Sequence, residues 1–441
     1  MLLDFTVENF RSIKGAETLS AVAASKSKAK PSNSESRRRI KSDDEIAQPF
    51  HVEGWDIDVL PVIAIFGANA SGKSNVLKAL EYLLSFMVQG VTEGECLREL
   101  ELIPFRLDKQ SRESPSFFNL RTVFDGTIYT YYLVIDNTRI IVEELKYALA
   151  NTKRDRLLFR RTWNEEDLRF DWKNGSDFFG SHIKLEKSLK EREPFISLFI
   201  NLSIEIVQPL IAWSFLSYLD INWEHRKLDW AILEILWGDQ YPNESKELTM
   251  VKELTMVIEN TKNLLLKLDT GLYDIEIRKD ENNKEDYQLY ALHKVANDEI
   301  ISWRFEEESI GTQRLFDLVY RMQFKLLRKG LLIADEIGSN VHPNIINEIV
   351  KLFQSPKTNP NRTQLIFTSH DNTLQRNSLL RRDQIWFTQK RPDQSTELYS
   401  LSDFKVRNDL AIDKAYLDGR FGAVPFISDE DDLMPVGEDN G

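Results

Sequence analysis

The sequence VIAIFGANASGKS, residues 62–74, decides the fold of this chain. The apolar run at residues 59–66 is typical of a buried strand in a parallel sheet, and it ends at Gly67. Residues 67–74 fit the pattern G-x-x-x-x-G-K-[ST]. After Gly72 the apolar residues recur with helical spacing. A strand, a glycine-rich turn and a helix in this order predict a loop that binds phosphate groups.

The residue types in this loop suit a bound polyphosphate. Glycines let backbone N–H groups surround phosphate oxygens, and the helix N-terminus adds the positive end of its dipole. We expect Lys73 to place its charge near the β- and γ-phosphates and Ser74 to offer an oxygen to Mg²⁺. The alternative is a glycine-rich turn with an incidental lysine. The nucleotide-binding residues predicted here are Gly67, Asn69, Ala70, Ser71, Gly72, Lys73, Ser74 and Asn75.

Polar groups also follow two short apolar runs, at residues 331–334 and 364–367. Ligands bind at the carboxyl ends of strands in open α/β sheets. We expect Asp335 to hold Mg²⁺, directly or through water, and Glu336 to activate the attacking water as general base. His370 would hydrogen-bond the γ-phosphate or that water. Taken alone, each pattern has a structural alternative, a strand meeting its loop or a structural histidine.

A fourth motif, Ser-Ile-Gly-Thr-Gln-Arg at residues 309–314, precedes a helix predicted over 314–328. A serine N-cap and a glycine at a helix start make a second anion site. The alternative is an ordinary helix cap.

In this order the four motifs resemble the ABC-type ATPases of the RecF, Rad50 and SMC group. More specifically, they resemble the short bacterial AAA15, or OLD-like, ATPases. The opening LLDFTVENFRSIKG, the block IPFRLD and the late YLDGRFGAVP add to the resemblance. It covers roughly residues 1–150 and 300–425, and residues 160–290 match only loosely.

The resemblance implies a dimer in which two subunits sandwich two ATP molecules. Ser309, Gly311 and Thr312 would bind the nucleotide held by the opposite subunit, and residues 338–340 would form a D-loop at the interface. Arg11 and Ser12 would lie near the nucleotide. The family's Q-loop falls near IPFRLD, which contains no glutamine, and Gln110 lies just beyond it, so this role stays unassigned.

We therefore expect an α/β fold, an ABC-type P-loop ATPase head with a mixed sheet, an antiparallel β lobe and an inserted helical lobe. The turn signals at 125–126 and 136–137 divide residues 117–148 into a β meander. We predict four divisions of the chain. The N-terminal half of the head spans residues 1–160, and a variable, largely helical insertion spans 161–300. The C-terminal half of the head spans 301–427, and an acidic tail spans 428–441.

The composition of the chain excludes several classes of protein. The chain has 441 residues, a formal net charge of -13 and one cysteine, Cys96. The cysteine count excludes a disulfide framework, and neither a signal peptide nor a membrane span is recognised, so we expect a cytoplasmic protein without membrane contact. Contact with DNA or RNA would need a local basic patch, for which residues 26–41 are the candidate.

The resemblance also implies a biological role. Short ATPases of this kind are sensor or regulatory subunits of two-gene bacterial anti-phage or abortive-infection systems, such as PARIS, Septu and RloA/RloB-like pairs. The chain would form a homodimer or higher homo-oligomer, respond to a DNA or phage-protein trigger, and control a separate nuclease or toxin.

Other roles stay open. One is a RecF-like or SMC-like DNA repair ATPase, and another is a nucleotide-gated scaffold with little turnover. The acidic cluster at 428–432 is a poor nuclease site, because two-metal chemistry needs carboxylates on a rigid frame. We expect any cutting activity to come from another polypeptide.

Overall fold

The structure is a computed structural model. It describes residues 1–24, 48–88, 101–178, 189–200, 205–218, 245–268, 270–279, 287–376, 379–407 and 410–425. Cys96, the basic stretch 26–41 and the acidic tail 428–441 lie outside the described residues. None of the helices in the described ranges is long and apolar enough to cross a membrane.

The sheet that carries the phosphate-loop motif has five strands in the order β14-β15-β5-β16-β17. The first four run parallel, and β17 is antiparallel to β16. The carboxyl ends of β14, β15 and β5 therefore meet at one edge of the sheet, as predicted. The strands are β5 (Val62–Gly67), β14 (Leu331–Ala334), β15 (Gln364–Thr368), β16 (Ile385–Lys390) and β17 (Thr396–Ser400).

The predicted antiparallel β lobe is a seven-stranded sheet in the order β10-β9-β8-β7-β6-β1-β2. Asp125 and Gly126 both have positive φ, which matches the twist of a tight hairpin between β6 and β7. The strands are β1 (Leu2–Glu8), β2 (Glu17–Ser20), β6 (Ser116–Phe124), β7 (Thr127–Ile135), β8 (Ile140–Leu149), β9 (Asp155–Asn164) and β10 (Arg169–Asn174). The lobe thus extends past the predicted boundary at 160. A short hairpin pairs β3 (Phe50–His51) with β4 (Asp58–Val59).

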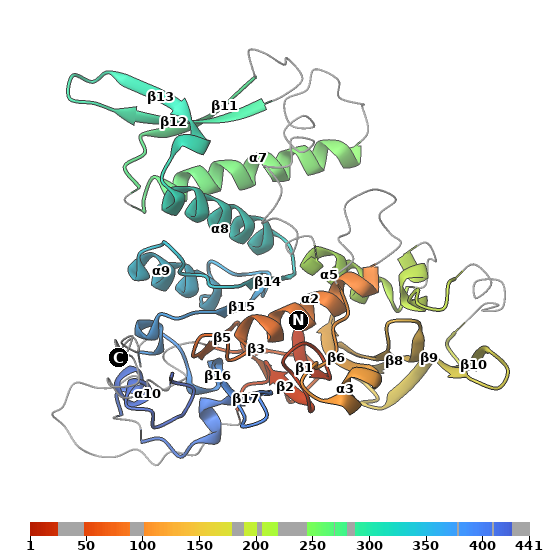
Figure 1. The fold of residues 1–441 in the computed structure, drawn as a ribbon. Coiled ribbons are helices and arrows are strands. Elements are labelled where there is room, and N and C mark those ends of the chain that lie inside the picture. Colours follow the sequence, from red (N-terminus) through yellow and green to blue (C-terminus); the bar gives the residue numbers. More distant parts are fainter. Residues whose placement is uncertain are drawn as a thin grey trace, which may run out of the picture.

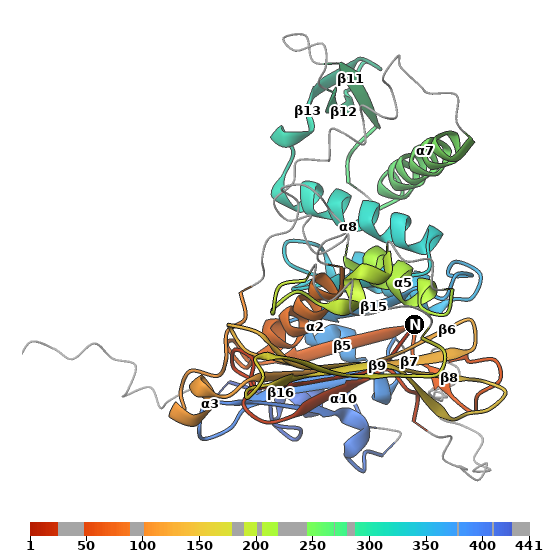
Figure 2. The same ribbon diagram turned by 90° about the vertical axis from the view of Figure 1, so that its right-hand side faces the viewer.

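Alternating side chains of β5 face two hydrophobic cores. Ile63 and Ile65 belong to a core shared with the antiparallel sheet, α2 and α5. Val62, Ala64 and Phe66 belong to a second core with α8, α9 and α10. Figures 1 and 2 show α5 and α8 above the two sheets, whereas α10 lies at the lower side of the molecule. The helices are α2 (Lys73–Val88), α3 (Lys109–Glu113), α5 (Gln208–Tyr218), α8 (Ile310–Leu327), α9 (Pro343–Gln354) and α10 (Ile412–Leu417).

The inserted region contains helices, as predicted, and also a small sheet. Helix α7 (Ser245–Leu265) is present and packs on α8. It is followed by a sheet of β11 (Asp274–Lys279), β12 (Tyr287–Lys294) and β13 (Ile300–Arg304). The described part of 161–300 therefore contains strands as well as helices, and the boundary at 300 falls inside this sheet. The sequence DIEIRK alternates with period two, which favours a strand over a helix.

A buried ion pair holds the antiparallel sheet to the segment that follows it. The carboxylate of Glu143 accepts hydrogen bonds from Arg161 Nε at 2.7 Å and from the backbone N–H groups of Phe195 and Ile196. Both charged side chains are almost fully buried. The guanidinium of Arg161 also lies 4.4 Å from the ring centroid of Phe170. The pair thus joins β8 and β9 to the short 3₁₀ helix at 195–200.

Replacing one half of this pair is expected to destabilise the fold. Glu143→Gln leaves the charge of Arg161 buried without a counter-ion, so the free energy of unfolding should fall by roughly 3–5 kcal/mol. Denaturant unfolding measures this change. Glu165→Gln is the control, because that carboxylate is exposed and 3.8 Å from Arg139, and its effect should stay within about 0.5 kcal/mol. If Glu143→Gln and Glu165→Gln lower the free energy of unfolding equally, the buried ion pair does not stabilise the fold.

Candidate functional site

The phosphate-loop motif forms the turn between β5 and α2, as its sequence predicts. Gly67 and Gly72 have φ angles of +154° and +109°, and Ala70 has φ 59°. A Cβ atom on Gly72 would lie 2.0 Å from Thr396 Oγ1, and one on Gly67 would lie 2.5 Å from the carbonyl oxygen of Thr388. The two glycines are therefore required by backbone shape and by close packing, and together they keep the loop tight.

Lys73 is the first residue of α2, and its side chain folds back over the loop. Its Nζ donates hydrogen bonds to the carbonyl oxygens of Gly67 and Ala68, each at 3.0 Å. Burial lowers the pKa of Lys73, and the nearby carboxylates of Asp335 and Glu336 oppose this shift. The ammonium group and both carboxylates therefore belong to one site.

The carboxylates are organised by a residue whose role the sequence did not reveal. Thr368, at the end of β15, donates its hydroxyl to Asp335 Oδ1 at 2.5 Å and accepts the backbone N–H of Glu336 at 2.7 Å. His370 Nε2 lies 3.7 Å from Glu336 Oε1. Both of these side chains are about half exposed, so a water molecule can reach them. The predicted catalytic pair is thus brought together.

The oxygen donors at this edge fit Mg²⁺ bound with a polyphosphate. Ser74 follows Lys73 at the start of α2, and Asp335 directly follows the last residue of β14. In the described part of the chain, no group of three or more His, Cys, Asp and Glu side chains is placed to hold a metal alone. Mg²⁺ commonly binds through one or two protein oxygens together with phosphate oxygens and water. Such an ion would neutralise charge on the phosphates and orient them.

Hydroxyl groups fasten the loop to the strands beside it. Thr388 Oγ1 lies 2.6 Å from Ser71 Oγ, and Thr396 Oγ1 donates to the carbonyl oxygen of Ser71 at 2.9 Å. Thr396 Oγ1 also lies 2.7 Å from Ser12 Oγ, which accepts a hydrogen bond from Asn75 Nδ2. Ser12 and Asn75 are therefore linked to the loop. Thr388 and Thr396 were not predicted, because they occur on β16 and β17 in no recognisable motif.

Thr396→Val tests this hydroxyl network. The substitution keeps the side-chain shape but removes the hydroxyl between Ser71 and Ser12, so the loop loses its link to β17. Loss of about 1 kcal/mol in hydrogen bonding should weaken nucleotide binding by roughly fivefold. Titration with a fluorescent ATP analogue measures the dissociation constant. Thr18→Val, on the exposed Thr6–Thr18 pair, is the control, and an equal effect there would refute a specific role for Thr396.

A cavity of about 320 Å³ lies beside the loop, next to the predicted residues Arg11 and Ser12. Arg11 has φ 52° and its N–H donates to Ile103 O at 2.7 Å. Burial lowers the pKa of Arg11, and its Nε has no hydrogen-bond partner among the described residues. The cavity adjoins the loop through Ser12 and Asn75. It is lined by Arg11, Ser12, Asn75, Ile103, Phe105, Arg106, Leu107, Lys390 and Gln394.

Gln110 does not join this site in the structure. It lies in the short helix α3 and is exposed, and its carbonyl oxygen accepts a hydrogen bond from Ser114 Oγ. The Q-loop role therefore stays unassigned.

The motif at 309–314 forms the N-terminus of α8. Ser309 is the N-cap, and its Oγ accepts the N–H of Thr312 at 3.1 Å. A Cβ on Gly311 would lie 2.7 Å from the carbonyl oxygen of Asn340, and Arg314 Nη1 donates to Ser339 Oγ at 2.7 Å. The motif therefore packs on the predicted D-loop. Among the described residues, none of its hydrogen bonds or ion pairs reaches 67–74.

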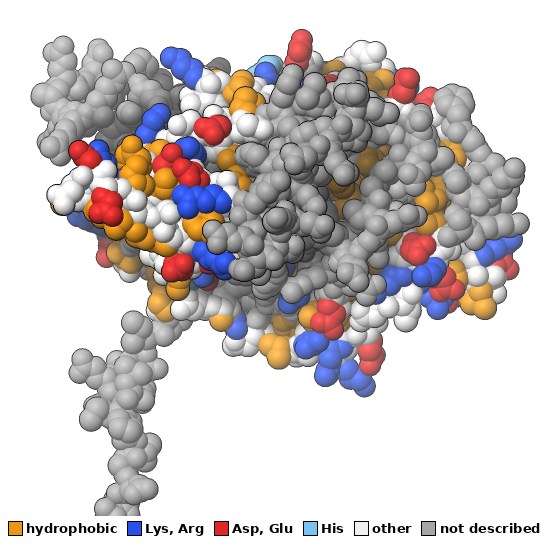
Figure 3. Space-filling view, turned by 90° about the horizontal axis from the view of Figure 1, so that it is seen from above, with side chains coloured by type: hydrophobic (Ala, Val, Ile, Leu, Met, Phe, Trp, Pro, Cys, Tyr) orange, Lys and Arg blue, Asp and Glu red, His pale blue; other side chains and the backbone are white. Residues whose placement is uncertain are grey.

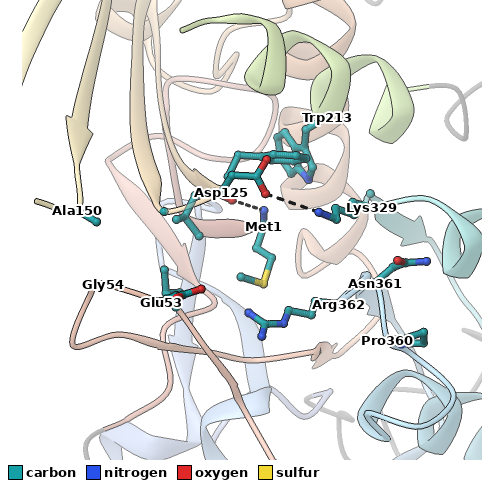
Figure 4. A pocket seen from close by; sticks show the side chains of 15 residues that line it. Met1, Glu53, Gly54, Asp125, Ala150, Trp213, Lys329, Pro360, Asn361 and Arg362 are labelled. Atoms are coloured by element: carbon teal, nitrogen blue, oxygen red, sulfur yellow. Dashed lines mark hydrogen bonds and ion pairs between the residues drawn. The ribbon is translucent and has the colours of Figure 1, made fainter. Parts of the chain in front are cut away.

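A second cavity, of about 520 Å³, lies at the opposite edge of the sheet, near the amino ends of the parallel strands (Figure 4). Met1, Trp213 and Arg362 contribute to its lining, and Asp125 and Lys329 form an ion pair of 3.6 Å across its rim. Its position separates it from Lys73 and the two carboxylates, so it does not belong to the predicted site.

Comparisons with known proteins give one family match. A family model described as "AAA domain, putative AbiEii toxin, Type IV TA system" matches residues 62–376, more than half of the chain. A search of curated proteins finds no match.

Three solved structures have similar folds at low sequence identity. One is an Smc head bound to the C-winged helix domain of ScpA, 13% identical, with a TM-score of 0.40 and coverage of 94% of this chain and 99% of that one. An SMC head from Thermotoga maritima is 13% identical, with a TM-score of 0.37 and coverage of 90% and 98%. An Smc head from Pyrococcus furiosus, with an extended coiled coil and the C-terminal domain of ScpA, is 12% identical, with a TM-score of 0.36 and coverage of 95% and 98%.

Proposed function

Because the chain belongs to this AAA domain family, we propose that it binds ATP with Mg²⁺ and hydrolyses it to ADP and phosphate. The observation that carries the proposal is the meeting of Lys73, Asp335, Glu336 and His370 at the ends of three neighbouring parallel strands. Lys73 and the loop N–H groups hold the phosphates, and Ser74 and Asp335 hold Mg²⁺. Glu336 takes a proton from the attacking water, and His370 hydrogen-bonds the water or the γ-phosphate.

We propose further that hydrolysis needs two subunits. Ser309, Gly311 and Thr312 lie at a helix start that suits an anion. Among the described residues, none of their hydrogen bonds reaches the loop of their own chain. A second subunit facing the site can bring the same three residues to its γ-phosphate. The side chain of Ile310, which stands between them, is 65% exposed, and that of Leu107, which lines the cavity beside the loop, is 69% exposed. A facing subunit would cover both.

The biological role that we propose is that of a cytoplasmic sensor or regulatory subunit in a bacterial anti-phage or abortive-infection system. The family description, with its toxin and its toxin–antitoxin system, supports this reading. ATP binding would close the two heads and hydrolysis would open them, and this cycle would hold or release a separate nuclease or toxin. DNA or a phage protein would be the trigger.

Native mass analysis tests this role. The chain is co-expressed with its neighbouring gene, purified with ATP as wild type and as Glu336→Gln, and examined before and after phage infection. A stable complex with a second protein that dissociates on infection would support the sensor role. A dimer that carries only DNA would instead indicate a repair ATPase. ATP bound at one per chain, with negligible phosphate release, would indicate a nucleotide-gated scaffold.

A further inference from the structure

The three-stranded sheet β11–β13 is joined to the N-terminus of α8 by one carboxylate. Glu308 directly precedes the N-cap Ser309, and its side chain is 9% exposed. Glu308 Oε1 lies 2.7 Å from His293 Nε2 on β12 and accepts a hydrogen bond of 2.7 Å from Trp303 Nε1 on β13. A buried carboxylate is costly to desolvate unless it is hydrogen-bonded, so these two contacts hold it in place.

His293 and Trp303, the two side chains that contact Glu308, also pack against each other. The rings of His293 and Trp303 stack with centroids 4.0 Å apart and planes at 12°. Trp303 pairs with Ala291 across the strands, and His293 pairs with Ile301, so the strand register fixes both rings. Their two nitrogen atoms therefore converge on a single oxygen atom. The position of Glu308 is set by the sheet and not only by the helix that follows.

On its other side, Glu308 is connected to the N-terminus of α8, the proposed anion site. The carbonyl oxygen of Glu308 accepts a hydrogen bond from Gln313 Nε2 at 2.8 Å, and this side chain also bonds to Glu306 O. The next residue, Ser309, caps the N–H of Thr312 and receives the N–H of Gln313 on its carbonyl oxygen. A shift of Glu308 would therefore turn the Ser309 peptide and loosen the first turn of α8.

The outer part of the sheet exposes apolar side chains. Tyr273, Val295, Ile300 and Ile301, in or beside its strands, are 39–49% exposed. Figure 3, seen from the end of the molecule that carries β11–β13, shows hydrophobic side chains among charged ones.

We infer that His293 and Trp303 are positioning residues that, through Glu308, hold Ser309 in the orientation needed to complete the site of a facing subunit. This inference rests on the proposed ATPase function. The sheet β11–β13 then influences hydrolysis. It does so through the N-terminus of α8, which faces the other subunit, and not through the phosphate loop.

The test compares Glu308→Ala with Glu308→Gln, which keeps a side-chain oxygen for the two donors, and with Glu306→Ala, an exposed neighbouring acid. The first measurement is amide hydrogen exchange without nucleotide. In Glu308→Ala the amides of Thr312 and Gln313 should exchange about tenfold faster than in wild type, while the rest of α8 stays protected. Unchanged exchange at these two amides would overturn the inference, whether or not the protein hydrolyses ATP.

The second measurement is turnover. In Glu308→Ala the kcat should fall about tenfold with ATP affinity unchanged, and Glu308→Gln should recover most of the loss. Glu306→Ala should match wild type. If wild type hydrolyses ATP and Glu308→Ala hydrolyses it equally fast, the inference fails while the proposed function stands. If wild type shows no turnover above that of Glu336→Gln, the proposed function fails, and so does the inferred influence of the sheet β11–β13 on hydrolysis.

Discussion

Glu336→Gln is expected to bind ATP as tightly as wild type but to release phosphate about a hundredfold more slowly, or slower still, because it removes a general base. The substitution keeps the size of the side chain and the backbone N–H bond to Thr368 Oγ1. What it removes is the carboxylate 3.7 Å from His370 that can take the proton of the attacking water. Phosphate release and equilibrium ATP binding, measured on the same preparation, separate the two effects.

The same variant should also accumulate as a closed dimer, because ATP that is bound but not hydrolysed keeps the two heads together. Size analysis with and without ATP measures this. Glu348→Gln is the control, since that exposed acid pairs with Lys351 on the surface of α9, and it should behave as wild type. Phosphate release at the wild-type rate in Glu336→Gln would show that another group activates the water.

Ser309→Arg is expected to reduce turnover by about a hundredfold or more, because it blocks an anion-binding helix start that stabilises charge in the transition state. ATP binding to the isolated chain should stay within about twofold, since, among the described residues, none of the motif's hydrogen bonds or ion pairs reaches the loop of its own chain. Ser309→Thr, which keeps the capping hydroxyl, is the matched variant and should keep most of the activity. Steady-state kinetics and ATP titration give both quantities.

Mixing two inactive variants tests whether the motif acts across subunits. Lys73→Ala removes the phosphate-binding lysine, and Ser309→Arg removes the facing helix start. A mixed dimer of a two-fold symmetric protein contains one site with both parts intact, so an equimolar mixture should recover about a quarter of wild-type turnover. Recovery of no activity, in a mixture that exchanges subunits, would mean that Ser309 acts within its own chain or only supports the fold.

The sequence predicted the elements around the site because their patterns are local. The switch from an apolar strand to a glycine-rich turn and an amphipathic helix is contained within residues 59–87. The short apolar runs that became β14 and β15 were recognisable in the same way. The insertion was harder to predict, since 161–300 carries β11 and β12 beside its helices. Short alternating runs near charged residues give a weaker signal than a long helical stripe.

The sequence by itself determined the phosphate loop, its lysine, the two carboxylates and His370, because each follows a strand whose residues are contiguous in the chain. Only the tertiary structure decided which hydroxyls support them. Thr388 and Thr396 reach the loop from more than 300 positions away, because β16 and β17 follow β5 in the order of the sheet. It also decided that Glu308 belongs to the sheet β11–β13 as much as to α8. Such contacts depend on strand register and packing, which no local pattern of residues encodes.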